Sequence, residues 1–134
     1  MSGKKILVIE DDRDVRLGYH VLLKANHYDT CFAEDGMSAL AEARKQQPDL
    51  IILDLGLPAG DGFVVLDRLG AMTRLAVIPV IVVSGRDVHA NKQRALSAGA
   101  KAFVQKPWDD TELLTLIAQL TGQAGAVSSA APAH

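Results

Sequence analysis

The chain has 134 residues, of which 49% are hydrophobic and 22% charged, which is an ordinary composition for one globular domain. Its formal net charge of -2 excludes a basic nucleic-acid-binding surface, because no excess of cations is present to displace counterions from phosphates. No apolar run is long enough to span a membrane, no signal peptide is evident, and the single cysteine, Cys31, excludes an internal disulfide. We therefore expect a cytoplasmic domain that itself binds neither nucleic acid nor a membrane.

The first half of the chain alternates between strand-like and helix-like patterns. In order, it predicts a strand at 5–9, a helix at about 13–25, a strand at 28–33, and a helix from 36 that stops at Pro48. Asp12 or Asp14 is predicted to cap the first helix, and Asn26-His27 to end it, with Asn26 in the left-handed conformation. The mixed polarity of the second strand favours an edge position. The side chains expected to pack from the second helix are Met37, Leu40, Ala41 and Ala43.

The same alternation continues through the second half. It predicts a strand at 50–53, a helix at about 62–71, a strand at 77–83, a helix at about 88–97 capped by Asp87, a strand at 102–104, and a helix from Asp109 to residue 120. Pro79 is acceptable only near the start of its strand, because proline has no N–H to donate to a neighbouring strand. The helix at 88–97 has few apolar residues, which predicts loose attachment.

This alternation of strands and helices indicates the fold class. Short links between alternating elements imply right-handed crossovers and a parallel sheet. We therefore predict an α/β domain over residues 4–121, with a doubly wound, five-stranded parallel sheet and five helices. After residue 120 the composition changes to Gly, Ala, Ser and Pro, so residues 122–134 are predicted to form a disordered tail or the stub of a linker.

Four of the predicted strands end in residues that can handle a metal ion and a phosphoryl group. These residues are Glu10, Asp11 and Asp12 after the first strand, Asp54 after the third, Ser84 after the fourth, and Lys106 after the fifth. In an open parallel sheet, ligands bind outside the carboxyl ends of the strands, so these side chains are expected to meet. Mg²⁺ prefers carboxylate oxygens, water and phosphate as ligands. Asp12 is also expected to complement the helix dipole.

Asp54 carries the most specific signal of the set. A carboxylate at the end of a strand buried on both faces needs a cationic partner or a metal ion. Carboxylates also accept phosphoryl groups as nucleophiles, and such transfer needs mainly in-line positioning and charge neutralisation. We predict that Asp54 is phosphorylated, with Mg²⁺ held by Asp11 and Asp54. Lys106 is predicted to cover further negative charge, and the Ser84 hydroxyl to bond a phosphoryl oxygen.

Taken together, these motifs resemble the receiver domain of two-component response regulators. The resemblance rests on the runs at 6–12, 49–58, 61–62 and 78–84, on Gly99-Ala100, Phe103 and Lys106-Pro107, and it extends from about residue 4 to residue 121. It implies a flavodoxin-like strand order 2-1-3-4-5. It also implies Mg²⁺-dependent transfer, with Mn²⁺ as a substitute, from a phosphohistidine of a sensor histidine kinase or phosphotransfer protein. A conformational switch would then signal through the face of the fourth helix, fifth strand and fifth helix to a downstream protein or output domain.

The resemblance also implies a role for each site residue. The implied roles are phosphoacceptor for Asp54, acidic metal pair for Glu10 and Asp11, metal ligand through its backbone carbonyl for Gly56, phosphoryl contact for Ser84 and Lys106, and switch for Ser84 and Phe103. The peptide bond before Pro107 is expected to be cis. Trp108 is expected to pack against the end of the first helix, close to the site.

Some positions depart from the family's usual pattern. Gly56 replaces a usually larger side chain and leaves the site more open to water, and Phe103 lacks the hydroxyl of the commoner tyrosine. Arg86, two residues after Ser84, either faces the site and orients or excludes the attacking water, or is a solvated loop charge. We predict that Arg86 and Gly56 mainly set the lifetime of the phosphoryl group.

Three alternatives stay open at this point. A phosphatase of the haloacid-dehalogenase kind would need a second acid two residues after the nucleophile, where Gly56 stands. A phosphorylation-independent interaction module is disfavoured because every catalytic position is filled. The chain also suits the receiver portion of a longer regulator with an output domain. Whether phosphorylation drives formation of a homodimer is not decided by the sequence.

Overall fold

The computed structural model describes residues 3–57, 61–85 and 88–122. Within them, strands and helices alternate as β1 (Lys5–Ile9), α1 (Arg13–Ala25), β2 (Asp29–Ala33), α2 (Gly36–Gln46), β3 (Leu50–Asp54), α3 (Asp61–Ala71), β4 (Val80–Ser84), α4 (Val88–Ser97), β5 (Ala102–Gln105) and α5 (Asp110–Leu120). The predictions for Arg86, Asp87 and the tail from residue 123 lie outside the described residues. None of the helices in the described ranges has the length and apolar character that a membrane span requires.

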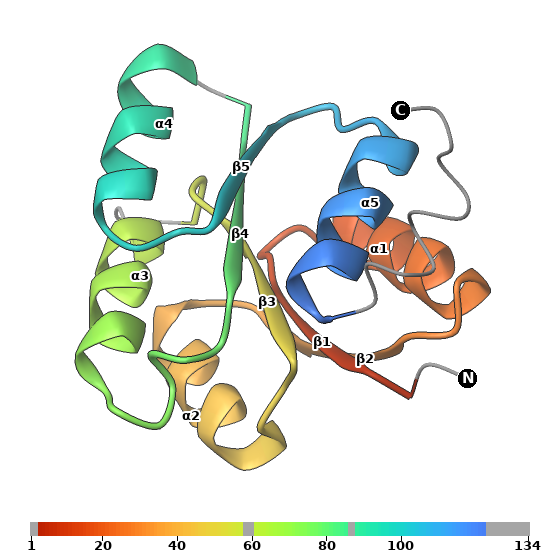
Figure 1. The fold of residues 1–134 in the computed structure, drawn as a ribbon, viewed down its shortest axis with the longest axis horizontal. Coiled ribbons are helices and arrows are strands. Elements are labelled where there is room, and N and C mark those ends of the chain that lie inside the picture. The colour runs from red at the N-terminus through yellow and green to blue at the C-terminus, as the bar shows by residue number, and fades with distance from the viewer. Residues whose placement is uncertain (1–2, 58–60, 86–87, 123–134) are drawn as a thin grey trace.

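The strands of the described residues form one parallel sheet of five strands in the order β2-β1-β3-β4-β5. Helices α1 and α5 cover one face of this sheet, and α2, α3 and α4 cover the other (Figure 1). The predicted fold class, strand order and edge position of β2 are therefore confirmed. Because the strands are parallel, their carboxyl ends lie along one edge, where the loops to the following helices begin.

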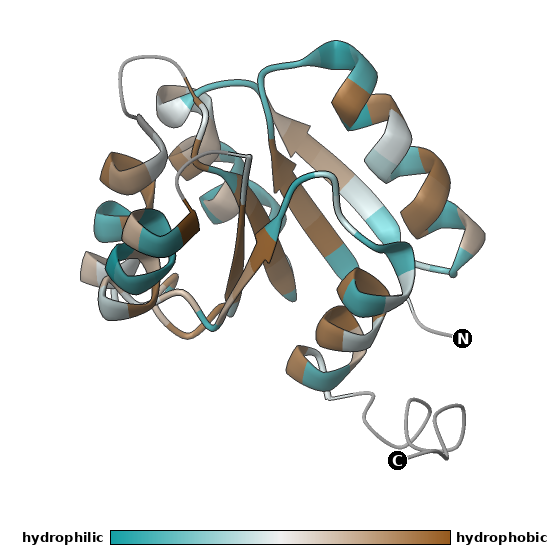
Figure 2. Ribbon diagram, turned by 90° about the horizontal axis from the view of Figure 1, so that it is seen from above, coloured by the Kyte–Doolittle hydropathy of each residue, from teal (hydrophilic) through white to brown (hydrophobic). Residues whose placement is uncertain are grey.

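Two layers of apolar side chains hold the helices against the sheet. Successive residues of a strand point to opposite faces. In β1, Leu7 and Ile9 accordingly face the layer beneath α2, α3 and α4, and Ile6 and Val8 face the layer beneath α1 and α5. Figure 2 shows the strands as predominantly hydrophobic ribbons between helices of mixed hydropathy. A sheet buried on both faces is a rigid base for residues at its strand ends.

The bounds of β4 differ from the prediction. The strand begins at Val80 rather than at residue 77, and the Val77 side chain is 80% exposed. The Pro79 carbonyl accepts a hydrogen bond from the Ile51 N–H at 3.0 Å, but Pro79 has no N–H to donate. Regular pairing therefore starts with the next residue. Strand β2 likewise starts one residue late, because the N–H of Tyr28 donates to Leu23 at the end of α1.

The ends of α1 show which residues stop and start it. Asp12, rather than Asp14, is the N-cap, since its carboxylate accepts hydrogen bonds from the N–H groups of Asp14 and Val15. At the other end Asn26 has φ of -109°, so the prediction of a left-handed Asn26 was wrong. His27, with φ of 69°, takes that conformation instead. The left-handed turn thus comes one residue later than predicted.

Helix α2 buries a different set of residues from the one predicted. Its buried side chains are Ala39, Leu40 and Ala43. Met37 is 87% exposed and Ala41 is also exposed, so the prediction that these two pack was wrong. Helical positions i, i+1 and i+4 form one narrow stripe, and Met37 and Ala41 fall outside it.

Helix α4 has few buried side chains, as predicted. Within this helix only Ala95 is buried. The guanidinium of Arg94 lies 3.7 Å from the centre of the Phe63 ring in α3, so a cation–π contact joins the two helices. Less apolar burial means a lower free energy for displacing α4 than for displacing its neighbours.

Candidate functional site

The site is a cavity of about 770 Å³ at the carboxyl ends of β1, β3, β4 and β5. Its lining includes all the side chains predicted to act on the metal ion and the phosphoryl group, namely Glu10, Asp11, Asp54, Ser84 and Lys106, together with the backbone of Gly56. Phe103 is not among the lining residues. Its half-buried ring packs against the layer beneath α2, α3 and α4. Arg86 lies outside the described residues.

Three carboxylates form the acidic part of the site. One oxygen from each of Glu10, Asp11 and Asp54 can be chosen so that all three lie within 4.8 Å of one another. Glu10 is 1% exposed and Asp54 is 5% exposed, but Asp11 is exposed to solvent. The pKa of Glu10 is raised to about 7, mainly by burial and in smaller part by the nearby Asp54 charge. A cation at this point would relieve both the burial and the repulsion.

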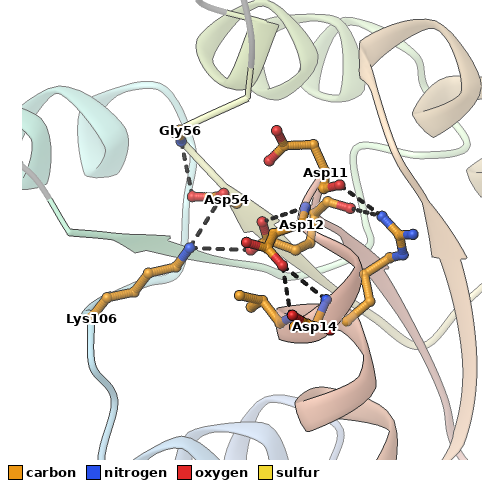
Figure 3. A network of polar contacts seen from close by, with 9 residues as sticks. Asp11, Asp12, Asp14, Asp54, Gly56 and Lys106 are labelled. Atoms are coloured by element: carbon orange, nitrogen blue, oxygen red, sulfur yellow. Dashed lines mark hydrogen bonds and ion pairs between the residues drawn. The ribbon is translucent and has the colours of Figure 1, made fainter.

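Lys106 places an ammonium group between two of these carboxylates. Its Nζ lies 3.1 Å from Glu10 Oε1 and 3.3 Å from Asp54 Oδ2 (Figure 3). Burial alone would lower the pKa of Lys106, but the charges of Asp54 and Glu10 raise it above its ordinary value. The peptide bond from Lys106 to Pro107 is cis, as expected. Because Asp54 and Glu10 raise its pKa, Lys106 stays charged. Its two ion pairs link the end of β5 to the ends of β1 and β3.

The turn after β3 holds the Asp54 carboxylate through a backbone hydrogen bond. The Gly56 N–H donates a hydrogen bond to Asp54 Oδ1 at 2.9 Å (Figure 3). A Cβ at position 56 would lie only 3.3 Å from that oxygen. Gly62, near the start of α3, approaches the same turn more closely, since a Cβ there would lie 2.7 Å from the Cα of Leu55. Both glycines therefore allow backbone and carboxylate to pack without an intervening side chain.

The loop from β1 to α1 is held by a residue that was not predicted from the sequence. Arg16 Nη1 donates to the backbone oxygens of Glu10 at 2.9 Å and Asp11 at 3.0 Å (Figure 3). Within the same loop, the Asp12 N–H donates to Glu10 Oε2 at 3.1 Å. An arginine one helical turn after an N-cap is a common surface residue, so its position alone did not mark it as part of the site.

Trp108 packs on α1, as predicted, but at a different point. Its ring stacks on Tyr19 with centroids 4.3 Å apart and planes 15° from parallel. Tyr19 lies in the middle of α1, so the prediction of packing at the helix end was wrong in this detail. The indole N–H donates to Asp110 Oδ1 at 2.9 Å, which fixes the ring relative to the first turn of α5. This stack lies directly after Lys106-Pro107 in the chain.

We expect the Tyr19→Phe substitution to raise the free energy of unfolding by about 1 kcal/mol. The Tyr19 hydroxyl is buried and has no hydrogen-bond partner among the described residues. Its removal therefore eliminates the free-energy cost of burying an unsatisfied polar group, and the stacked ring is kept. Tyr28→Phe is the matched control, because the Tyr28 hydroxyl forms a hydrogen bond with the Thr121 side chain. That variant is expected to lose stability. Urea unfolding measures both changes, and a loss of stability in Tyr19→Phe would contradict the assignment of an unpaired hydroxyl.

The fold and the site together define a flavodoxin-like α/β domain with an acidic, lysine-containing site at its strand ends. The chain belongs to the response regulator receiver domain family, whose model matches residues 6–118. It is 36% identical over 118 residues to the response regulator PleD of Caulobacter vibrioides, which covers 87% of this chain and 26% of PleD. It is 37% identical over 108 residues to the KDP operon regulator KdpE of Escherichia coli, which covers 81% of this chain and 47% of KdpE. The chain thus spans less than half the length of these relatives.

Solved receiver domains have the same architecture. The receiver domain of a Francisella response regulator superimposes with a TM-score of 0.82 at 29% identity, covering 90% of this chain and 98% of that one. The receiver domain of a Pseudomonas aeruginosa sensor histidine kinase superimposes with a TM-score of 0.82 at 25% identity, covering 90% of this chain and 99% of that one. The latter was solved with a magnesium ion coordinated in its active site cleft.

Proposed function

We propose that residues 4–121 form a phosphorylation-operated switch that accepts a phosphoryl group on Asp54. The observation that carries this proposal is the position of the Asp54 carboxylate. It is 5% exposed, lies 3.3 Å from the Lys106 ammonium, and has Glu10 and Asp11 oxygens within 4.8 Å. A buried carboxylate among cationic and metal-ligating groups suits a nucleophile whose product carries still more negative charge.

The donor set of the site fits Mg²⁺, or Mn²⁺ in its place. Mg²⁺ takes hard oxygen ligands and is bound by one or two carboxylates together with water and phosphate. We propose Asp11 and Asp54 as direct ligands, Glu10 as the second member of the acidic pair, and the backbone carbonyl of Gly56 as a further ligand. When bound, the metal ion neutralises charge on the transferring phosphoryl oxygens.

The transfer step is a displacement at phosphorus. An Asp54 carboxylate oxygen attacks the phosphorus of a partner's phosphohistidine, the new P–O bond forms, and the P–N bond breaks. The histidine nitrogen keeps the electron pair of that bond, so the imidazole leaves as a base that takes up a proton. Lys106 is proposed to donate from Nζ to a phosphoryl oxygen, and the Ser84 hydroxyl to donate to another. The donor would be a sensor histidine kinase or a phosphotransfer protein.

The signal is proposed to leave through α4, β5 and α5. Ser84 ends β4, and Phe103 lies on the neighbouring strand β5, where it is the register partner of Val82. We propose that Ser84 moves toward the phosphoryl group and that the Phe103 ring moves inward with it. Burial of only Ala95 within α4 suits a helix that shifts during such a switch. The recipient would be a downstream protein, an output domain or a second copy of this domain. A lone cysteine suits the cytoplasm as the site of this signalling.

The test is incubation of the chain with MgCl₂ and acetyl phosphate, followed by intact mass measurement. We expect a mass increase equal to one phosphoryl group, and no increase when the metal is chelated with EDTA. Acetyl phosphate is a minimal donor, so the experiment does not depend on identifying the partner kinase. Absence of any mass increase would contradict the proposal and favour an interaction module that works without phosphorylation.

Gly56 and Arg86 are proposed to set the lifetime of the phosphoryl group. Gly56 leaves the space beside the Asp54 carboxylate open to water, and Arg86 is proposed to orient or exclude that water. We expect Gly56→Asn to slow hydrolysis about tenfold, or ~1.4 kcal/mol of activation free energy. We expect Arg86→Ala to change the hydrolysis rate by a similar factor.

Both rates are read from the decay of the phosphorylated mass after acetyl phosphate is removed. Arg74→Ala is the charge control. It removes an arginine in the turn before β4, away from the carboxyl ends of the strands where the site lies. A decay rate in Arg86→Ala equal to that of the wild type would show that Arg86 is only a solvated loop charge.

A further inference from the structure

We infer that Arg16 is a positioning residue that fixes the direction of the metal-binding carboxylate of Asp11. This inference rests on the proposed function, because it concerns the same acidic site. Arg16 Nη1 donates to the backbone oxygens of Glu10 and Asp11 at 2.9 and 3.0 Å. The Arg16 side chain is 17% exposed, and its hydrogen bond to the Glu10 oxygen is partly buried, whereas the one to the Asp11 oxygen is exposed.

We call these two hydrogen bonds from Arg16 the brace. The loop needs it because Asp11 follows the end of the strand and precedes the start of the helix, so neither element holds its backbone. Strand β1 ends at Ile9, and α1 begins at Arg13. The Arg16 N–H bonds to the Asp12 oxygen at 3.0 Å, so the first turn of α1 carries the guanidinium back over the loop. By holding two successive carbonyls, the guanidinium fixes the peptide planes on both sides of Asp11.

Asp11 depends on this brace more than its neighbours do. Glu10 accepts from the Asp12 N–H and from Lys106, and Asp12 accepts from two N–H groups of α1. The Asp11 carboxylate has no hydrogen bond or ion pair with any residue that the structure describes. The backbone therefore sets the direction of the Cα–Cβ bond from which this carboxylate reaches a metal ion, and Arg16 holds that backbone. Outer groups that orient metal ligands in this way typically contribute 10- to 100-fold to metal affinity.

Charge alone predicts the opposite effect, which makes the inference testable. A guanidinium near a cation site repels the cation, so loss of the Arg16 charge would tighten Mg²⁺ binding if electrostatics dominated. Loss of the brace would weaken binding instead. The remaining charged contact of Arg16 among the described residues is a 4.0 Å pair with Glu34, whose side chain is 71% exposed, so it contributes little.

The experiment is calorimetric titration of the full chain with MgCl₂. We expect Arg16→Met, which keeps an apolar stem but no donor, to weaken Mg²⁺ binding at least about tenfold. Arg16→Lys keeps the charge and several N–H donors on one nitrogen, but its side chain is shorter and its donors are not held in a plane, so we expect a smaller loss. Arg13→Met is the matched control: it removes the same charge at the exposed first residue of α1, and we expect unchanged or slightly tighter binding.

The possible outcomes separate the brace from other causes. Equal or tighter Mg²⁺ binding by Arg16→Met would overturn the inference and leave the proposed function intact. Absence of Mg²⁺ binding by the wild type would instead count against the proposed function itself. Urea unfolding without Mg²⁺ checks that each variant is folded. If Arg16→Met does not fold, Arg16→Lys decides: weaker binding supports the brace, and wild-type binding overturns it.

Discussion

The Asp54→Asn variant is expected to show no mass increase with acetyl phosphate and Mg²⁺, under conditions that phosphorylate the wild type fully. The amide has nearly the shape of the carboxylate, but its oxygen is a poor nucleophile toward phosphorus. It also carries no charge, so it offers a metal ion less than the buried carboxylate does. Intact mass measurement gives a yes-or-no answer for this position.

Asp49→Asn is the matched control for this prediction. Asp49 directly precedes β3, at the opposite end of the strand from Asp54, and its exposed carboxylate accepts a hydrogen bond from the Lys5 N–H at 2.8 Å. We expect Asp49→Asn to be phosphorylated as well as the wild type. A full mass increase in Asp54→Asn would place the phosphoryl group on another residue and overturn the assignment of the acceptor.

The second large effect is expected from Gly62→Ala, which should lower the free energy of unfolding by about 3 kcal/mol. The added Cβ would meet the Leu55 Cα at 2.7 Å and the Asp54 carbonyl oxygen at 3.1 Å. Both are backbone atoms, so no side chain can rotate away to make room. Either α3 or the turn after β3 must move, and movement of that turn displaces Asp54 and the hydrogen bond from Gly56.

Gly70→Ala in the same helix is the control for this substitution. A Cβ at Gly70 meets no atom within 4 Å, so alanine there is expected to raise stability by up to about 1 kcal/mol. Urea unfolding of both variants measures the difference, and acetyl phosphate labelling reports whether the Asp54 turn has moved. Equal stability of Gly62→Ala and the wild type would show that α3 is free to shift away from β3.

The fold could be predicted because its signals are local in the sequence. Apolar runs of strand length, separated by capped amphipathic stretches, specify alternating elements whatever their final contacts. Errors arose where the outcome depends on contacts between distant segments. Pro79 could be recognised from the sequence as unfavourable inside a strand. The start of β4 at Val80 depends in addition on the pairing with β3, in which the Ile51 N–H donates to the Pro79 carbonyl. Likewise, the buried stripe of α2 is set by its orientation on the sheet, which left Met37 outside it.

The candidate site could be predicted to a similar extent, and for a related reason. Strand ends in a parallel sheet converge, so Asp54 and Lys106 could be brought together from their places in the alternation alone. Arg16 could not, because its role depends on where a helical side chain folds back over a loop. Trp108 could be predicted to pack on α1, but Tyr19 could not be predicted as its stacking partner, since that depends on how α1 and the start of α5 pack against each other.

Lys106 has a consequence for how the domain is assembled. Its ammonium gives Glu10 and Asp54 a counter-charge that belongs to the chain itself. The acidic centre is therefore compatible with a folded chain before any metal ion arrives, unlike structural metal sites, in which the ion supplies the free energy of folding. Folding then does not require the metal ion. Under the proposed function, the supply of free divalent ions would govern how much of the folded protein is competent to react.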